Sequence, residues 1–134
     1  MNHEVLQPSG WPRPKGYANG VAASGRMIFT AGVVGWNEHE NFVHDSLAGQ
    51  FRQVLINTRA IIAEGGAETA DIVRMTCYVT DKREYLDSLP DIGAAWRDIF
   101  GKVFPCMAVV EVNALVEDAA KIEIETTAVI ADKT

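Results

Sequence analysis

The cysteines and histidines have the widest chemical repertoire in this sequence, and their spacing points to no reaction by itself. Cys77 and Cys106 lie within apolar, strand-like stretches, and no Cys-x-x-Cys or Cys/His spacing suits a metal ion. A nucleophilic thiolate needs a neighbouring base or cation, and the sequence shows none beside Cys106. The histidines, His3, His39 and His44, stand apart from any helical pairing. We therefore expect two buried thiols in a reducing compartment and no metal site.

Glu123 and Glu125 are the carboxylates with the clearest structural setting. They alternate with Ile122 and Ile124, as in a strand that buries one of its faces. Because the two glutamates alternate identically, the pattern fits solvent-facing residues with no role.

The composition is that of an ordinary globular protein and argues against several functional classes. The chain has 134 residues, 48% apolar and 22% charged, and we expect one domain over residues 1–134. No apolar run approaches the ~20 residues that span a bilayer, and no secretory signal is visible. We therefore expect a cytoplasmic protein with no membrane partner. The net charge is −6 and the basic residues are scattered, whereas nucleic-acid binding needs a basic stripe, so we expect no nucleic-acid partner.

The N-terminal third predicts an irregular leader followed by two strands. Prolines and glycines interrupt residues 1–16. Residues 18–23 and 27–31 are strand-like, and Ser24-Gly25-Arg26 between them favours a hairpin. Glycines and polar residues over 32–41 then predict a loop.

The first helix follows this loop. Asp45 or Ser46 can cap its start, because a short side-chain oxygen accepts from free backbone N–H groups. Gly65-Gly66 ends it, because glycine tolerates the left-handed closing conformation. Residues at three- and four-residue steps form one mostly apolar stripe. The stripe consists of Leu47, Phe51, Val54, Leu55, Thr58, Ile61 and Ile62.

A strand and a second helix come next. Residues 72–79 are rich in β-branched and apolar side chains and predict the strand. Asp81-Lys82-Arg83-Glu84 has the pattern of a capping box with Asp81 as the cap. A helix over about residues 83–100 follows it. Pro90 falls inside this helix, which therefore either kinks there or has its true start later.

Residues 107–112 and 121–130 predict the last two strands. The order β-β-α-β-α-β-β results, with room for a short extra strand near Val5. This order predicts an α+β fold, a mixed β-sheet with two helices packed on one face. The second face of the sheet then needs cover, which self-association can supply.

Six short segments, in order and spacing along nearly the whole chain, carry a family pattern. They are residues 16–20 (GYANG), 27–32 (MIFTAG), 63–67 (AEGGA), 72–79 (IVRMTCYV), Phe104-Pro105, and 121–125 (KIEIE) with Ala128. This set resembles the RidA (YjgF) family of small enamine/imine deaminases. The resemblance implies a chorismate-mutase-like homotrimer, whose sheets close around a barrel-like core.

The resemblance also implies a small-molecule pocket between neighbouring subunits. In the family, an arginine two residues after the proline binds the substrate carboxylate. A glutamate of the last strand and a backbone carbonyl position the water that attacks the imine carbon. At the matching position of this chain, the resemblance implies that Glu123 is the catalytic residue. The substrate-binding residues are Tyr17, Ala31, Gly32, Cys106 and Met107.

Met107 stands where the family has its arginine, and this departure changes the expected chemistry. Arginine binds a carboxylate through two charge-assisted hydrogen bonds, whereas methionine offers an apolar contact and no donor. Three alternatives follow: the substrate lacks a carboxylate at this point, Arg13 or Lys15 binds it instead, or the pocket holds a ligand without turning it over. Trp36, in a flanking loop, suits an apolar or aromatic ligand and equally suits interface packing.

The function that the resemblance favours is hydrolysis of a C=N bond in a small molecule, with release of ammonia. The pocket would be more apolar than is usual in the family, and no cofactor is expected. The alternative is a catalytically silent ligand-binding or regulatory trimer of the same fold, which the missing arginine supports. The family's older association with ribonuclease activity fits poorly with a net charge of −6.

Overall fold

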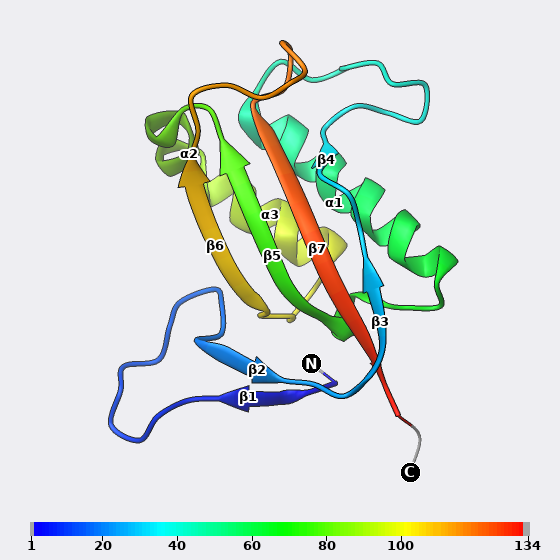
Figure 1. Ribbon diagram of the computed structural model, residues 1–134. Helices are drawn as coiled ribbons and strands as arrows, with labels where there is room; N and C mark the ends of the chain where they lie inside the picture. The colour runs from blue at the N-terminus through cyan, green and yellow to red at the C-terminus, as the bar shows by residue number, and fades with distance from the viewer. Residues whose placement is uncertain (1, 133–134) are drawn as a thin grey trace.

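A mixed β-sheet with its helices on one face forms the centre of the structure, a computed structural model that describes residues 2–132 (Figure 1). The strand order is β3-β7-β5-β6, and a fifth strand, β4, pairs with β7. The five strands are β3 Gly25–Phe29, β4 Val33–Val34, β5 Ile72–Val79, β6 Cys106–Glu111 and β7 Ile122–Ala131. Strands β5 and β6 are parallel, while β7 is antiparallel to β3, β4 and β5. The predicted α+β fold with a mixed sheet is confirmed.

The helices lie together behind the sheet in the view of Figure 1. They are α1 Leu47–Glu64, α2 Lys82–Asp87 and α3 Leu89–Ile99, with a 3-10 turn at Thr69–Asp71. The predicted limits of α1 are confirmed, since the Ser46 side chain accepts from the Gly49 N–H at 3.0 Å and Gly65 is the C-cap. Its predicted stripe is buried except for Ile61, which is 44% exposed. None of the helices in the described residues has the length and apolarity that membrane crossing requires.

The side chains of β5 and β7 alternate between a buried face and an open face. Met75 and Cys77 lie under the helices together with Ile124, and all three are at most 1% exposed. Tyr78 follows the buried Cys77, Glu123 precedes the buried Ile124, and the two are paired with each other. Because successive side chains of a strand point to opposite faces, Tyr78 and Glu123 lie on the open face. Burial raises the pKa of the Cys77 thiol to about 12, so this cysteine is the inert core thiol that the sequence predicts.

The predicted hairpin between the first two strands is wrong. Strand β2 (Gly20–Ala22) pairs with β1 (Glu4–Leu6) in a separate two-stranded ribbon, and β3 pairs with β7. Gly25 has a φ of +145°, and a Cβ there would collide with the carbonyl oxygen of Ile130. The chain therefore passes closely against β7 at Gly25 instead of turning back on β2. The short strand near Val5, for which the sequence left room, is confirmed as β1.

The second predicted helix is in fact two helices. Helix α2 ends at Asp87, and α3 begins at Leu89 with Pro90 in its first turn. Proline is tolerated there because the first N–H groups of a helix have no intrahelical acceptor. Strand β4 falls within the loop predicted over 32–41, because two residues are too few to show an alternating pattern.

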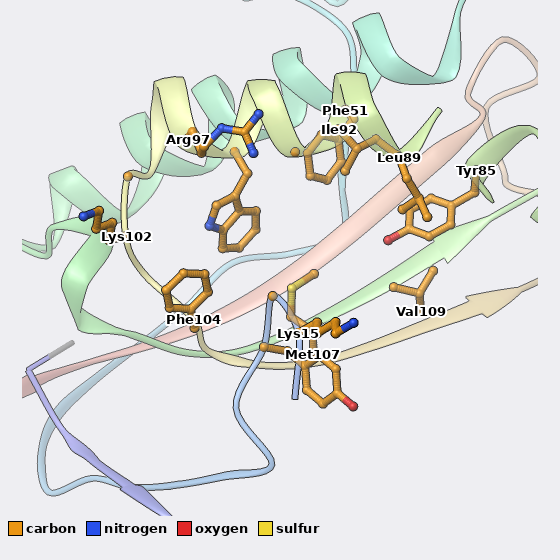
Figure 2. Close-up of a pocket in the computed structure, with 15 residues that line it drawn as sticks. Lys15, Phe51, Tyr85, Leu89, Ile92, Arg97, Lys102, Phe104, Met107 and Val109 are labelled. Atoms are coloured by element: carbon orange, nitrogen blue, oxygen red, sulfur yellow. The ribbon is translucent and has the colours of Figure 1, made fainter. Parts of the chain in front are cut away.

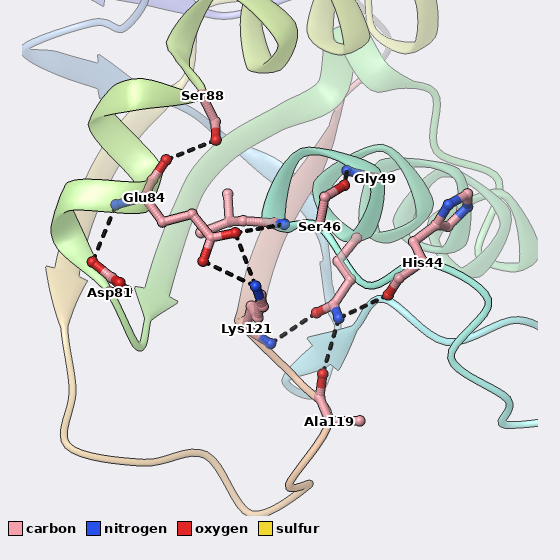
Figure 3. Close-up of polar contacts among 10 residues, drawn as sticks. His44, Ser46, Gly49, Asp81, Glu84, Ser88, Ala119 and Lys121 are labelled. Atoms are coloured by element: carbon pink, nitrogen blue, oxygen red, sulfur yellow. Dashed lines mark hydrogen bonds and ion pairs between the residues drawn. The ribbon is translucent and has the colours of Figure 1, made fainter.

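Glu84 makes contacts that the capping-box pattern does not predict. Asp81 caps α2 as expected, since its side chain accepts from the Glu84 N–H at 3.1 Å. The Glu84 carboxylate instead accepts from the Leu47 N–H at 3.2 Å and forms an ion pair with Lys121 at 3.0 Å (Figure 3). Glu84 thereby ties the start of α1 to the start of β7.

The buried side chain of Gln50 completes this junction. Its amide nitrogen donates to the carbonyl oxygens of His44 at 3.1 Å and Ala119 at 2.9 Å. Its oxygen accepts from the Lys121 N–H at 2.8 Å (Figure 3). One side chain therefore satisfies three backbone groups from two segments that approach α1.

Replacing Gln50 with Leu should destabilise the protein, because three part-buried backbone groups would lose their partner. Leaving buried polar groups unsatisfied costs on the order of 2–3 kcal/mol here, which urea denaturation followed by circular dichroism would measure. Gln53→Leu on the same helix is the matched control, since Gln53 is half-buried and donates to the Asn57 side chain at 2.8 Å. A loss for Gln50→Leu no larger than that for Gln53→Leu would contradict the prediction.

Candidate functional site

The carboxylate of Glu123 lies directly against Gly32. Glu123 is paired with Val34 of β4 on one side and with Tyr78 of β5 on the other. A Cβ at position 32 would collide with the Glu123 carboxylate. Glycine at this position is therefore what allows the carboxylate and the Ala31-Gly32 backbone to meet, as the predicted site requires.

Glu125 differs from Glu123 despite the identical alternation in sequence. The Tyr78 hydroxyl donates to the Glu125 carboxylate at 2.7 Å. This hydrogen bond raises the pKa of Tyr78 from its ordinary value. Glu125 is therefore engaged in a contact within the sheet, whereas the side-chain hydrogen bonds within residues 2–132 leave the Glu123 carboxylate as an available acceptor.

A cavity of about 690 Å³ lies between α3, β6 and the N-terminal leader (Figure 2). Its size is typical of small-molecule sites. Three of the predicted or alternative site residues line it together: Lys15, Tyr17 and Met107. Met107 is half-buried and packs against the hydrophobic core, so its side chain forms part of an apolar wall.

Trp96 forms the best-fixed part of this wall. Its indole N–H donates to the Val103 carbonyl oxygen at 2.9 Å. Its ring stacks with Phe51 at a centroid distance of 6.5 Å and meets the edge of Phe100 at 4.8 Å. The indole is therefore held in one orientation, and a flat apolar ligand would find a preformed surface.

The structure does not bring Met107 and Glu123 together within one chain. Met107 is paired with Met75, which faces the helices, whereas Glu123 is paired with Tyr78 on the open face. Strand β5 separates the two strands that carry them. The two side chains therefore leave the sheet in opposite directions.

The remaining predicted residues are distributed around these two places. Arg13 lines a hollow of about 450 Å³ that also contacts Tyr17. Trp36 lines another, of about 370 Å³, beside Ala31 and Gly32. The expectation of two buried thiols holds only for Cys77. Cys106 is half-buried, because it is in register with the exposed Arg74 and lies on the open face of the sheet, away from the cavity that Met107 lines.

Several cavity residues were not identified from the sequence as site residues. Tyr85 and Trp96 fall within the helix predicted over about residues 83–100 without any sign of a site, and Arg97 and Lys102 likewise carry no signal in the sequence. Their role depends on the leader lying across the cavity from α3, which a local pattern does not encode. Within residues 2–132, no group of three or more His, Cys, Asp or Glu side chains is arranged to hold a metal ion.

Known proteins resemble this chain over most of its length. Residues 12–130 match the family described as endoribonuclease L-PSP. The 2-iminobutanoate/2-iminopropanoate deaminase of Escherichia coli is 36% identical over 84% of this chain and 86% of its own. A RutC family protein of Pyrococcus abyssi is 30% identical over 96% and 98% of the two chains.

Solved structures agree with these sequence matches. The conserved Rid family protein YyfB of Yersinia pestis has a TM-score of 0.84 and 32% identity, covering 97% of this chain and 100% of its own. The YjgF gene product of E. coli has a TM-score of 0.66 and 32% identity over 94% and 98%. The order of elements, the motifs and both kinds of match therefore agree: the chain belongs to the endoribonuclease L-PSP family, the family of the RidA (YjgF) proteins.

Proposed function

We propose that this protein hydrolyses a C=N bond in a small molecule, as an enamine/imine deaminase that releases ammonia. Its E. coli relative is named as a deaminase of 2-iminobutanoate and 2-iminopropanoate. The observation that carries the proposal is the Glu123 carboxylate lying against Gly32, with none of the side-chain hydrogen bonds within residues 2–132 engaging its oxygens. The Cys77 thiol takes no part in the proposed reaction, since it is buried within the core.

Glu123 has the chemistry that this reaction needs. Its carboxylate accepts a proton from a bound water molecule, and the water oxygen forms a bond to the imine carbon. The electron pair of the C=N bond moves to nitrogen, which takes up the proton that Glu123 accepted from water. Glu123 then removes the hydroxyl proton of the carbinolamine as the carbonyl forms and passes this proton to the nitrogen, which leaves as ammonia. One imine and one water thus give one carbonyl compound and one ammonia.

The proposed site is shared between subunits of a homotrimer. Met107 and Glu123 lie on opposite faces of the sheet, so a pocket using both would take one from each of two chains. The open face also leaves apolar side chains uncovered, with Met27 58%, Phe29 65% and Val110 43% exposed. Exposed apolar groups of this kind mark association surfaces.

The trimer can be tested by its mass in solution. Sedimentation velocity should give one species of about three times the chain mass, because only a partner can cover the open face. Phe29→Glu should shift the protein to smaller species, since a charge would have to be desolvated at the interface. Wild-type protein that sediments near the monomer mass would exclude both the trimer and the shared pocket.

Replacing Glu123 with Gln should abolish most C=N hydrolysis and leave the trimer intact. The amide keeps the shape beside Gly32 but cannot take a proton, and a positioned base is worth about 100- to 10,000-fold. Ammonia release from freshly generated imines measures the rate. Glu125→Gln is the matched control from the same strand and should stay within a few-fold of wild type. Equal rates for Glu123→Gln and wild type would make Glu123 an ordinary strand residue.

Met107 should make the wild type a poor enzyme for short imines of 2-amino acids, because its side chain offers no carboxylate partner. Met107→Arg should raise ammonia release from these imines and tighten the binding of a short 2-oxo acid. The gain is limited by the cost of placing a charge among apolar neighbours. Met107→Leu, which keeps the apolar wall, is the control.

Two results would change this assignment. A wild type that already hydrolyses such imines efficiently would show that Met107 is no obstacle, and Arg13 and Lys15 would become the residues to replace. A folded, trimeric Met107→Arg that gains neither binding nor turnover would favour the alternative of a catalytically silent ligand-binding trimer.

A further inference from the structure

The charged side chains that line the Met107 cavity are all basic. The chain carries a net charge of −6, yet the cavity is lined by Lys15, Arg97 and Lys102 and by no aspartate or glutamate (Figure 2). The three cations come from separate segments: the leader, the last turn of α3, and the residues just after α3. The charge that lines the cavity is therefore positive, although the chain as a whole is acidic.

Within residues 2–132, these three cations form none of the ion pairs found. All three side chains are exposed, so they lie around the mouth of the cavity and not in its floor. Arg97 extends over Gly93, where a Cβ would come within 3.2 Å of its Nη1, and Gly93 itself lines the cavity.

The interior of the cavity is apolar and largely aromatic. Phe51, Ile92, Trp96 and Met107 line it, with Phe104 at 45% exposure nearer the surface. Figure 2 shows the Tyr85 hydroxyl directed into the space. Burial raises the pKa of Tyr85, so at neutral pH its hydroxyl keeps its proton and can donate a hydrogen bond.

We propose that this cavity binds an organic carboxylate with an aromatic body, the ring against Trp96 and the carboxylate at the mouth among Lys15, Arg97 and Lys102. Apolar walls favour the ring, while the unpaired cations favour the charge without being buried. The proposal rests on the proposed function only in identifying this ligand with the substrate; the binding itself requires no turnover.

Titration calorimetry with three matched compounds tests the ligand class. Phenylacetate should bind about ten-fold or more tightly than phenylacetamide, which has the ring without the charge, and than acetate, which has the charge without the ring. Raising sodium chloride from about 50 mM to about 500 mM should weaken phenylacetate binding, because salt screens exposed charges. Equal affinities for phenylacetate and phenylacetamide would overturn the role of the cations, and equal affinities for phenylacetate and acetate would overturn that of the ring.

Charge-removing variants test the residues. Lys15→Gln, Arg97→Gln and Lys102→Gln should each weaken phenylacetate binding about two- to five-fold, the size expected of exposed charge pairs. The triple variant should weaken it about ten-fold or more, with phenylacetamide unaffected. Arg83→Gln removes an exposed cation that does not line the cavity and is the control. A triple variant that binds phenylacetate like wild type would overturn the proposal.

Failure of this inference and failure of the proposed function give different results. Selective phenylacetate binding without any imine hydrolysis would support the ligand class and reject the deaminase activity. Imine hydrolysis by a protein that does not discriminate between phenylacetate and phenylacetamide would support the deaminase and reject the ligand class.

Discussion

The alternation of side chains across the paired strands β5 and β7 determines where chemistry can occur in this protein. On one face, Met75 and Ile124 are fully buried beneath α1 and α3. On the other, Tyr78 and Glu123 lie opposite each other without a helix above them. A shift of one residue in register would exchange the two faces and bury a carboxylate in the core. The core therefore fixes the direction of Glu123 as firmly as it fixes that of the apolar residues.

A single glycine then places this carboxylate. Glu123 is held close to the Ala31-Gly32 backbone because position 32 has no Cβ, so any side chain there would push the carboxylate away. The junction of Gln50, Glu84 and Lys121 lies just before Glu123 on β7 and anchors the start of that strand to α1 and α2. Packing on the helix side and polar contacts at the strand end thus position one side chain on the opposite face.

Local patterns predicted the elements well, and non-local contacts account for what they missed. Strand β5 and helix α1 have strong hydrophobic patterns, and α1 also has clear capping residues. The sequence therefore predicts both with their correct limits. The partner of β3 was missed because an apolar strand pairs equally well with several others, and only the close approach of Gly25 to β7 decides between them.

Similarly, Glu123 and Glu125 are indistinguishable in sequence but differ in space, since only Glu125 has Tyr78 as a donor. Arg97 and Lys102 were missed because their common cavity is closed by the distant leader.

The proposed pocket differs from one with an arginine at position 107 in where its positive charge lies. An arginine at position 107 would put a cation within an apolar wall, where it must be paired to repay its desolvation. A short ligand with its carboxylate next to the reacting carbon provides that pairing. Cations at the mouth remain hydrated. This lowers the free-energy cost of leaving them without a bound carboxylate, and it also lowers the gain in binding free energy when a carboxylate pairs with them. A pocket built in this way depends more on the apolar body of its ligand for affinity, so the same family fold can favour a larger molecule without a change in its backbone.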